Sequence, residues 1–170
     1  MPPCAAQPWL GGYDFFRTHE GYGVYSVLGD QRDQIRAIVS AFTTGEVWSI
    51  DTYWLEAYKV DNERLTIPNE EGSFRGALVG YGKFLQSLDV NPPFVWTAGM
   101  ENLEGRFLYP SAPPGRMRIH TGPVGKGVTD VVSDSGLYFL GDSPGQTLKP
   151  FFAKLYNSCG VRRENWQDET

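Results

Sequence analysis

One stretch of the chain, residues 70–88, repeats its apolar residues every three or four positions. This spacing places them on one face of an α-helix. Acidic residues follow Pro68, and the helix dipole favours them in a first helical turn. At the other end, Pro92 and Pro93 interrupt the helical pattern. The sequence therefore predicts a central helix. Its apolar face consists of Phe74, Ala77, Leu78, Tyr81, Phe84, Leu85 and Leu88.

Two further helices are predicted. One begins at Asp30 or Asp33 as the capping residue and ends at Thr43–Gly45. Its apolar residues are Ile35, Ile38, Val39 and Phe42. The other closes the chain, with Thr147 as its cap and Gly160 as a left-handed stop. Its apolar stripe is Leu148, Phe151, Phe152, Leu155 and Cys159.

Strands are predicted wherever β-branched and aromatic residues gather between turn signals. Residues 53–60 fit either a helical turn or a strand, because periodicity alone cannot distinguish these structures in a short apolar run. The predicted strands cover residues 21–29, 46–51, 65–67, 94–99, 105–109, 117–121, 124–132 and 136–140.

This gives about three helices among six to eight short strands, without the regular alternation of a parallel sheet. The predicted class is α+β, with a mostly antiparallel mixed sheet packed against the helices. With 170 residues, 41% of them hydrophobic, the chain has enough apolar material for one core. We expect an irregular arm over residues 1–12 and a single domain over residues 13–170.

Composition narrows the functional classes. A net charge of -5 disfavours a protein that coats nucleic acid indiscriminately. The sequence has no apolar run long enough for a membrane span and no signal peptide at its start, so we expect a cytoplasmic protein. Cys4 and Cys159 are predicted to be free thiols, and no cofactor is indicated.

The charge is unevenly distributed. Residues 105–129, which we call the basic segment, contain no Asp or Glu and carry +4, which leaves -9 for the rest of the chain. Alternate positions on a strand face the same side, so part of this segment could present several cations together. The ordinary alternative is a solvated strand whose charges are balanced by neighbouring acids. The candidate anion-binding residues are Arg106, Arg116, Arg118, His120 and Lys126.

Other patterns suggest chemistry less strongly. Gly122–Gly127 resembles a phosphate-binding loop, but Lys126 is followed by Gly127 rather than Ser or Thr, which favours a β-turn. Glu46 and Asp51, with His120, would be the candidate catalytic groups of a metal-dependent nuclease or phosphohydrolase. However, an odd spacing directs Glu46 and Asp51 to opposite faces of a strand.

Several aromatic side chains offer stacking surfaces for a base or another flat ligand. In a domain of this size most of them should instead be needed in the core. The residues considered are Trp9, Trp48, Trp54, Trp96, Tyr22 and Tyr25.

Several segments resemble the C-terminal region of bacterial Schlafen/AlbA-type putative DNA-binding proteins. They are Thr44–Thr52, Asn91–Gly99, Leu103–Leu108, Gly122–Pro123 and Leu148–Gly160. The AlbA-type module itself, with its acidic and basic motif and glycine-rich loop, is not found in this sequence. The resemblance thus implies a companion module in a bacterial, cytoplasmic or phage-defence setting, without nuclease residues to carry over.

The sequence therefore favours a non-catalytic accessory module that recognises a protein partner, such as an AlbA-type module, or nucleic-acid phosphates. A metal-dependent nuclease or phosphohydrolase and a structural subunit of a larger assembly remain the alternatives.

Overall fold

The computed structural model describes residues 13–28, 31–52, 59–60, 64–67, 71–108 and 124–162. The chain forms two compact units. Unit 1 consists of residues 1–53 and 76–92, and unit 2 of residues 54–75 and 93–170. Helix α2 (Glu71–Ser87) begins in unit 2 and continues in unit 1.

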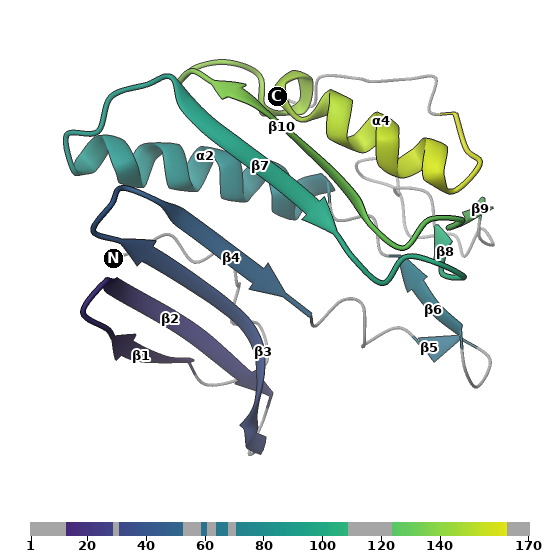
Figure 1. Ribbon diagram of the computed structural model, residues 1–170, viewed down its shortest axis with the longest axis horizontal. Helices are drawn as coiled ribbons and strands as arrows, with labels where there is room; N and C mark the ends of the chain where they lie inside the picture. Colours follow the sequence, from purple (N-terminus) through teal and green to yellow (C-terminus); the bar gives the residue numbers. More distant parts are fainter. Residues whose placement is uncertain are drawn as a thin grey trace, which may run out of the picture. The chain divides into compact units, whose positions relative to one another are not determined.

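Unit 1 is built on a four-stranded antiparallel sheet in the order β1-β2-β3-β4 (Figure 1). Ala37 and Val39 form its buried centre. Val47 of the fourth strand and Tyr81 of helix α2 pack against them. Helix α2 therefore covers one face of this sheet. The strands are β1 (Tyr13–Arg17), β2 (Gly21–Leu28), β3 (Gln31–Phe42) and β4 (Val47–Asp51).

The helix predicted to begin at Asp30 or Asp33 is wrong, because its apolar residues belong to the twelve-residue strand β3. Ala37 and Val39 are buried on one face of β3, while Ile38 and Phe42 lie on the other. Apolar residues on both faces produce the same spacings as a helical stripe. Pairing with β2 and β4 on both sides decides in favour of a strand, to which the β-branched residues are suited.

The central helix is confirmed, with Glu71 in its first turn. It ends before the two prolines: Asp89 has a φ of 61°, and the Val90 N–H donates to the Leu85 carbonyl at 3.1 Å. This left-handed stop satisfies a terminal carbonyl. The predicted apolar face is half-buried, except that Leu88 beyond the helix is 58% exposed.

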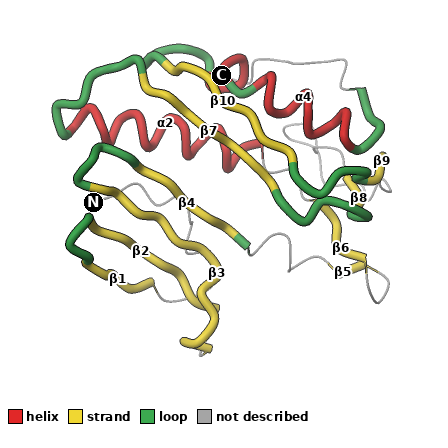
Figure 2. Tube along the Cα trace, viewed as in Figure 1, coloured by secondary structure: helices red, strands yellow, loops and turns green. Residues whose placement is uncertain are grey.

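Unit 2 contains a two-stranded antiparallel sheet, β7 (Phe94–Met100) with β10 (Val132–Tyr138). Side chains of β7 alternate strictly between buried and exposed. Helix α4 (Lys149–Ser158) lies along β10 (Figure 2). The ring of Trp96 lies across Gly136 on the neighbouring strand, where a Cβ would meet it at 3.0 Å.

The final helix carries the predicted stripe: Leu148, Phe151, Phe152, Leu155 and Cys159 are all buried. Gly160 has a φ of 71°, and the Val161 N–H donates to the Tyr156 carbonyl, which completes the predicted left-handed stop.

The prediction of Thr147 as the cap of this helix is wrong. Thr147 ends the short helix α3 (Pro144–Thr147), which Ser143 caps, and α4 follows directly after Leu148 without a side-chain cap. The reason is that Pro144 starts a helical turn earlier than the apolar stripe does.

A small sheet of unit 2 has the order β5-β6-β8-β9. The β6–β8 pairing is parallel and the other two are antiparallel. The strand predicted over residues 124–132 is instead split between β9 and the start of β10, with an irregular segment between them. The bounds are β5 (Lys59–Val60), β6 (Arg64–Ile67), β8 (Phe107–Leu108) and β9 (Gly125–Lys126).

The α+β class is confirmed. Among the described residues there are three helices and ten strands, and seven of the strands have four or more residues. The predicted arm over residues 1–12 and the candidate strand over residues 117–121 lie outside the described residues.

Candidate functional site

The structure brings together two residues of the basic segment, Arg106 and Lys126. Phe107, next to Arg106, pairs with Lys126 between β8 and β9, and the Gly127 N–H donates to the Arg106 carbonyl at 2.8 Å. Lys126 is exposed, and its Nζ lies 5.9 Å from the centre of the Phe107 ring. Arg106 is half-buried, and its Nε donates to the Asn102 carbonyl. The other predicted anion-binding residues, Arg116, Arg118 and His120, lie outside the described residues.

The glycines around Lys126 have a packing role. A Cβ on Gly125 would meet the Cys159 carbonyl oxygen at 2.2 Å, and one on Gly127 would meet the Leu103 carbonyl oxygen at 2.2 Å. Only a residue without a side chain fits either place.

Backbone N–H groups in this segment are already engaged. Those of Val124, Lys126, Gly127 and Val128 donate to carbonyls within unit 2 at 2.8–3.1 Å. A phosphate-binding loop needs such groups directed at the anion. The geometry thus disfavours such a loop, although Gly125 and Lys126 lie in strand β9 rather than in the β-turn that the sequence favours. An anion here would meet the Lys126 side chain rather than a cradle of amides.

The candidate catalytic residues that the structure describes do not form a cluster. Asp51 ends β4 opposite Ala37, whereas Glu46 lies in the turn before β4, where it accepts a hydrogen bond from Thr44 Oγ1 at 3.3 Å. Asp51 shares the Val47 face of the strand. Both carboxylates are exposed, and His120 lies outside the described residues. Within the described ranges, no group of three His, Cys, Asp or Glu side chains is arranged to hold a metal ion.

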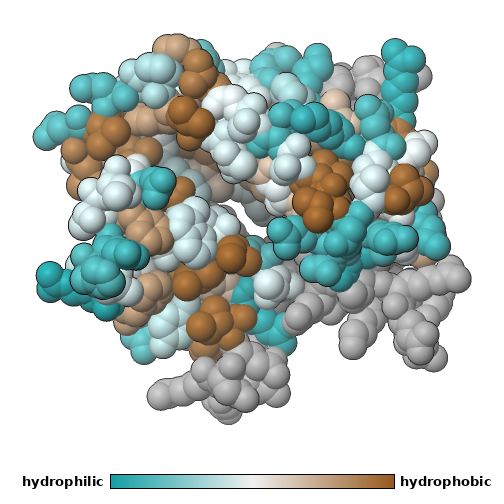
Figure 3. All heavy atoms as spheres, in the orientation of Figure 1, coloured by the Kyte–Doolittle hydropathy of each residue, from teal (hydrophilic) through white to brown (hydrophobic). Residues whose placement is uncertain are grey.

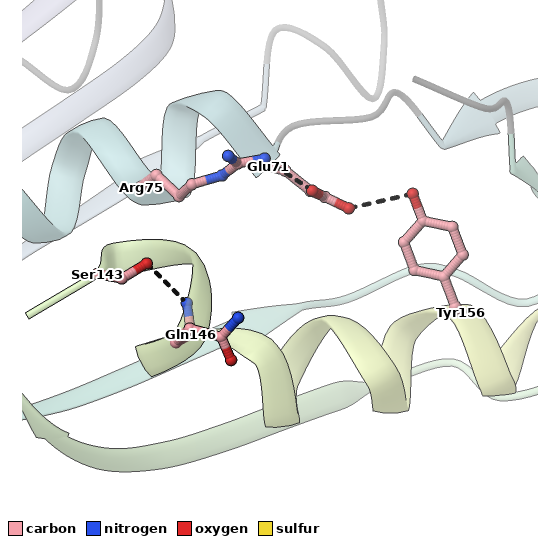
Figure 4. Close-up of polar contacts among 5 residues, drawn as sticks. All are labelled: Glu71, Arg75, Ser143, Gln146 and Tyr156. Atoms are coloured by element: carbon pink, nitrogen blue, oxygen red, sulfur yellow. Dashed lines mark hydrogen bonds and ion pairs between the residues drawn. The ribbon is translucent and has the colours of Figure 1, made fainter. Parts of the chain in front are cut away.

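A buried polar network joins α2 to α4 within unit 2 (Figure 4). Glu71, only 4% exposed, receives hydrogen bonds from Arg75 at 2.9 Å and from the Tyr156 hydroxyl at 3.1 Å. Phe74 packs beside this network on Phe151, with ring centres 4.9 Å apart. Of this network, the sequence predicted only the acidic first turn of α2. The network is best explained as a structural connection, because a buried carboxylate needs such partners.

Cys159 is a buried free thiol, as predicted. Burial raises its pKa, although a contact with Ser158 Oγ acts in the opposite direction. A raised pKa keeps the thiol protonated and disfavours a nucleophilic role. Cys4 lies outside the described residues.

Aromatic residues divide between the core and the surface. Trp96 is 8% exposed and belongs to the core of unit 2, as predicted, whereas Trp48 is 42% and Tyr22 57% exposed on the sheet of unit 1. Trp9 and Trp54 lie outside the described residues.

Apolar side chains that are half-buried or exposed line the sheet of unit 1 on the side opposite Ala37 and Val39. By strand register this side carries Phe16, Tyr25, Ile38, Phe42, Trp48 and Ile50, which we call the aromatic face. Phe42 and Trp48 stack at 5.8 Å, and Phe16 and Tyr25 are 6.2 Å apart. The sequence prediction missed this face because it assigned β3 to a helix.

Among the described residues, no helix is long and apolar enough to span a bilayer. In comparisons with known proteins, no family model, curated protein or solved structure matches the chain.

Proposed function

We propose that the chain is a non-catalytic binding module whose basic segment recognises the phosphates of a nucleic acid. The observation that carries the proposal is the pairing of β8 with β9, which sets the exposed Lys126 opposite Phe107, the residue that follows Arg106, in an otherwise acidic protein. Clustered cations bind nucleic acid by displacing the counterions of its phosphates.

The resemblance to Schlafen/AlbA-type proteins supports the same proposal. It implies that the module accompanies a DNA-binding domain in a bacterial cytoplasm. In that setting the basic segment would add phosphate contacts, while sequence recognition would rest with the partner module.

A salt titration tests the proposal with a fluorescent twenty-base-pair DNA duplex as the probe. We expect Lys126→Gln and the double variant Arg116→Ala/Arg118→Ala to weaken binding. Each lost phosphate contact should lower the slope of log affinity against log salt by about 1.

The matched control is Lys83→Gln, because Lys83 is an exposed lysine of unit 1 outside the basic segment. Unchanged affinity and an unchanged salt slope in both test variants would refute phosphate recognition by this segment.

A further inference from the structure

The aromatic face of unit 1 is partly exposed, on a sheet whose opposite side is packed at its centre. Ala37 and Val39 are 5% and 3% exposed beneath Val47 and Tyr81. On the aromatic face, Trp48 and Ile50 remain 42% and 54% exposed. Figure 3 shows that apolar side chains reach the surface over the part of the view occupied by strands β2 to β4. Exposed apolar groups that lie together on one face are typical of an interaction site.

The rings of this face lie over small residues. A Cβ on Gly23 would fall 2.0 Å from the Phe16 ring, so this ring covers the glycine. Ser40 pairs with Gly23 on one side and Trp48 on the other, and is only 6% exposed. Flat rings over a floor of Gly23 and Ser40 make a broad surface, to which the π-faces of the rings can contribute.

Carboxylates accompany these rings. Asp14 lies on the same face, where its Oδ2 accepts from the Tyr25 hydroxyl at 3.5 Å. Glu46 precedes Trp48 in the chain, and the turn that contains Glu20 adjoins Thr43, whose N–H donates to the Glu20 carbonyl at 2.7 Å. Glu20 and Glu46 are both exposed.

The nearest cation on β3 is Arg36, which lies at the irregularity in the pairing with β2, between Ile35 and Ala37. It is half-buried and lies six residues before Phe42 on β3, roughly 20 Å along the strand. The end of the sheet that bears Phe42 and Trp48 is therefore flanked by Glu20 and Glu46.

We propose that the aromatic face docks an arginine- or lysine-bearing segment of a partner protein. A guanidinium or ammonium group is attracted to the faces of exposed rings and to neighbouring carboxylates. Phosphates are repelled by those same carboxylates, so charge complementarity favours a basic peptide over a nucleic acid. This site is in unit 1 and does not depend on the basic segment of unit 2.

Two synthetic probes test the docking site: an alternating glycine–arginine peptide and its glycine–glutamate counterpart, both with blocked ends. Backbone amide shifts of the full chain are followed by NMR at low salt. We expect the arginine peptide to shift amides of β1 to β4, with weaker binding at higher salt, and the glutamate peptide to shift none of them.

Variants locate the contact. We expect Trp48→Ser to weaken binding of the arginine peptide roughly two- to fivefold, and Glu46→Gln to weaken it roughly twofold with a smaller salt dependence. The matched controls in unit 2 are Val95→Ser, at a residue that is 78% exposed, and Glu104→Gln, at an exposed carboxylate. They should leave the affinity unchanged. Glu46→Gln keeps the test decisive if Trp48→Ser disturbs folding.

Three kinds of outcome would overturn the proposal. The first is a lack of discrimination, seen either as equal binding of both peptides or as unchanged affinity in both Trp48→Ser and Glu46→Gln. The second is a shift of the same amides by oligothymidine, which would make the face a nucleic-acid surface. The third is a shift that follows protein concentration alone, which would make the occupant a second copy of this chain.

Discussion

Strand β7 of unit 2 and strand β3 of unit 1 distribute their apolar side chains differently. In β7, the buried residues Phe94, Trp96, Ala98 and Met100 all lie on one side, and alternate residues are exposed. In β3, apolar residues lie on both sides, and among the side chains described, those of residues 35–42, the buried hydrophobics are Ala37 and Val39. Strand β7 thus serves a core, whereas β3 serves a core on one face and carries the half-buried Ile38 and Phe42 on the other.

The two tryptophans show the difference most directly. Trp96 lies across Gly136 in the core of unit 2, while Trp48 stacks on Phe42 at the surface of unit 1. The same residue type is therefore buried in the core of one unit and partly exposed on the sheet of the other. Three experiments challenge this comparison.

The largest expected effect is the loss of a core ring. Trp96→Ala should reduce the free energy of unfolding by about 3–5 kcal/mol, because it leaves a cavity against Gly136. Trp48→Ala should cost only about 1 kcal/mol, which is the value of an aromatic pair at a half-exposed position. Urea unfolding measures both. Equal costs would show that the aromatic face is a core surface and would break the comparison.

A smaller effect is expected from the polar network of unit 2. Tyr156→Phe should cost about 1.5–3 kcal/mol, because it removes a hydrogen bond to the buried carboxylate of Glu71. Tyr22→Phe is the control, since Tyr22 is 57% exposed on unit 1, and it should leave the unfolding free energy nearly unchanged. Equal stability of the two variants would contradict a structural role for the network.

The smallest effect concerns Cys159, in a Cys4→Ser background that leaves one thiol. Burial raises the pKa of the Cys159 thiol in the folded protein above its ordinary value of 9.0. The protonated thiol therefore contributes fully to stability below pH 9, and this contribution is lost as the pH rises through the pKa of the folded protein. The additional variant Cys159→Ala removes this pH dependence. Urea unfolding across that pH range compares the two proteins. Identical pH profiles would contradict the burial of the thiol.

Elements with one buried face were predictable from the sequence. The stripe of α4, its stop at Gly160 and strand β7 follow from short-range spacing, because a single packed side imposes a single period on the chain. The α+β class follows from the succession of these elements. The helix stop at Gly160 is likewise local, since the backbone conformation of one residue decides it.

Tertiary structure alone decided what depends on distant partners. Residues 35, 38, 39 and 42 suit a helix by spacing, yet pairing with β2 and β4 makes β3 a strand and creates the aromatic face. The same holds for Glu71 and Tyr156, which are 85 residues apart, and for Phe107 beside Lys126. The periodicity of apolar residues predicts which side of a helix or strand is buried. It does not predict which other element packs against that side, because the packing partner is decided by contacts between segments far apart in the chain.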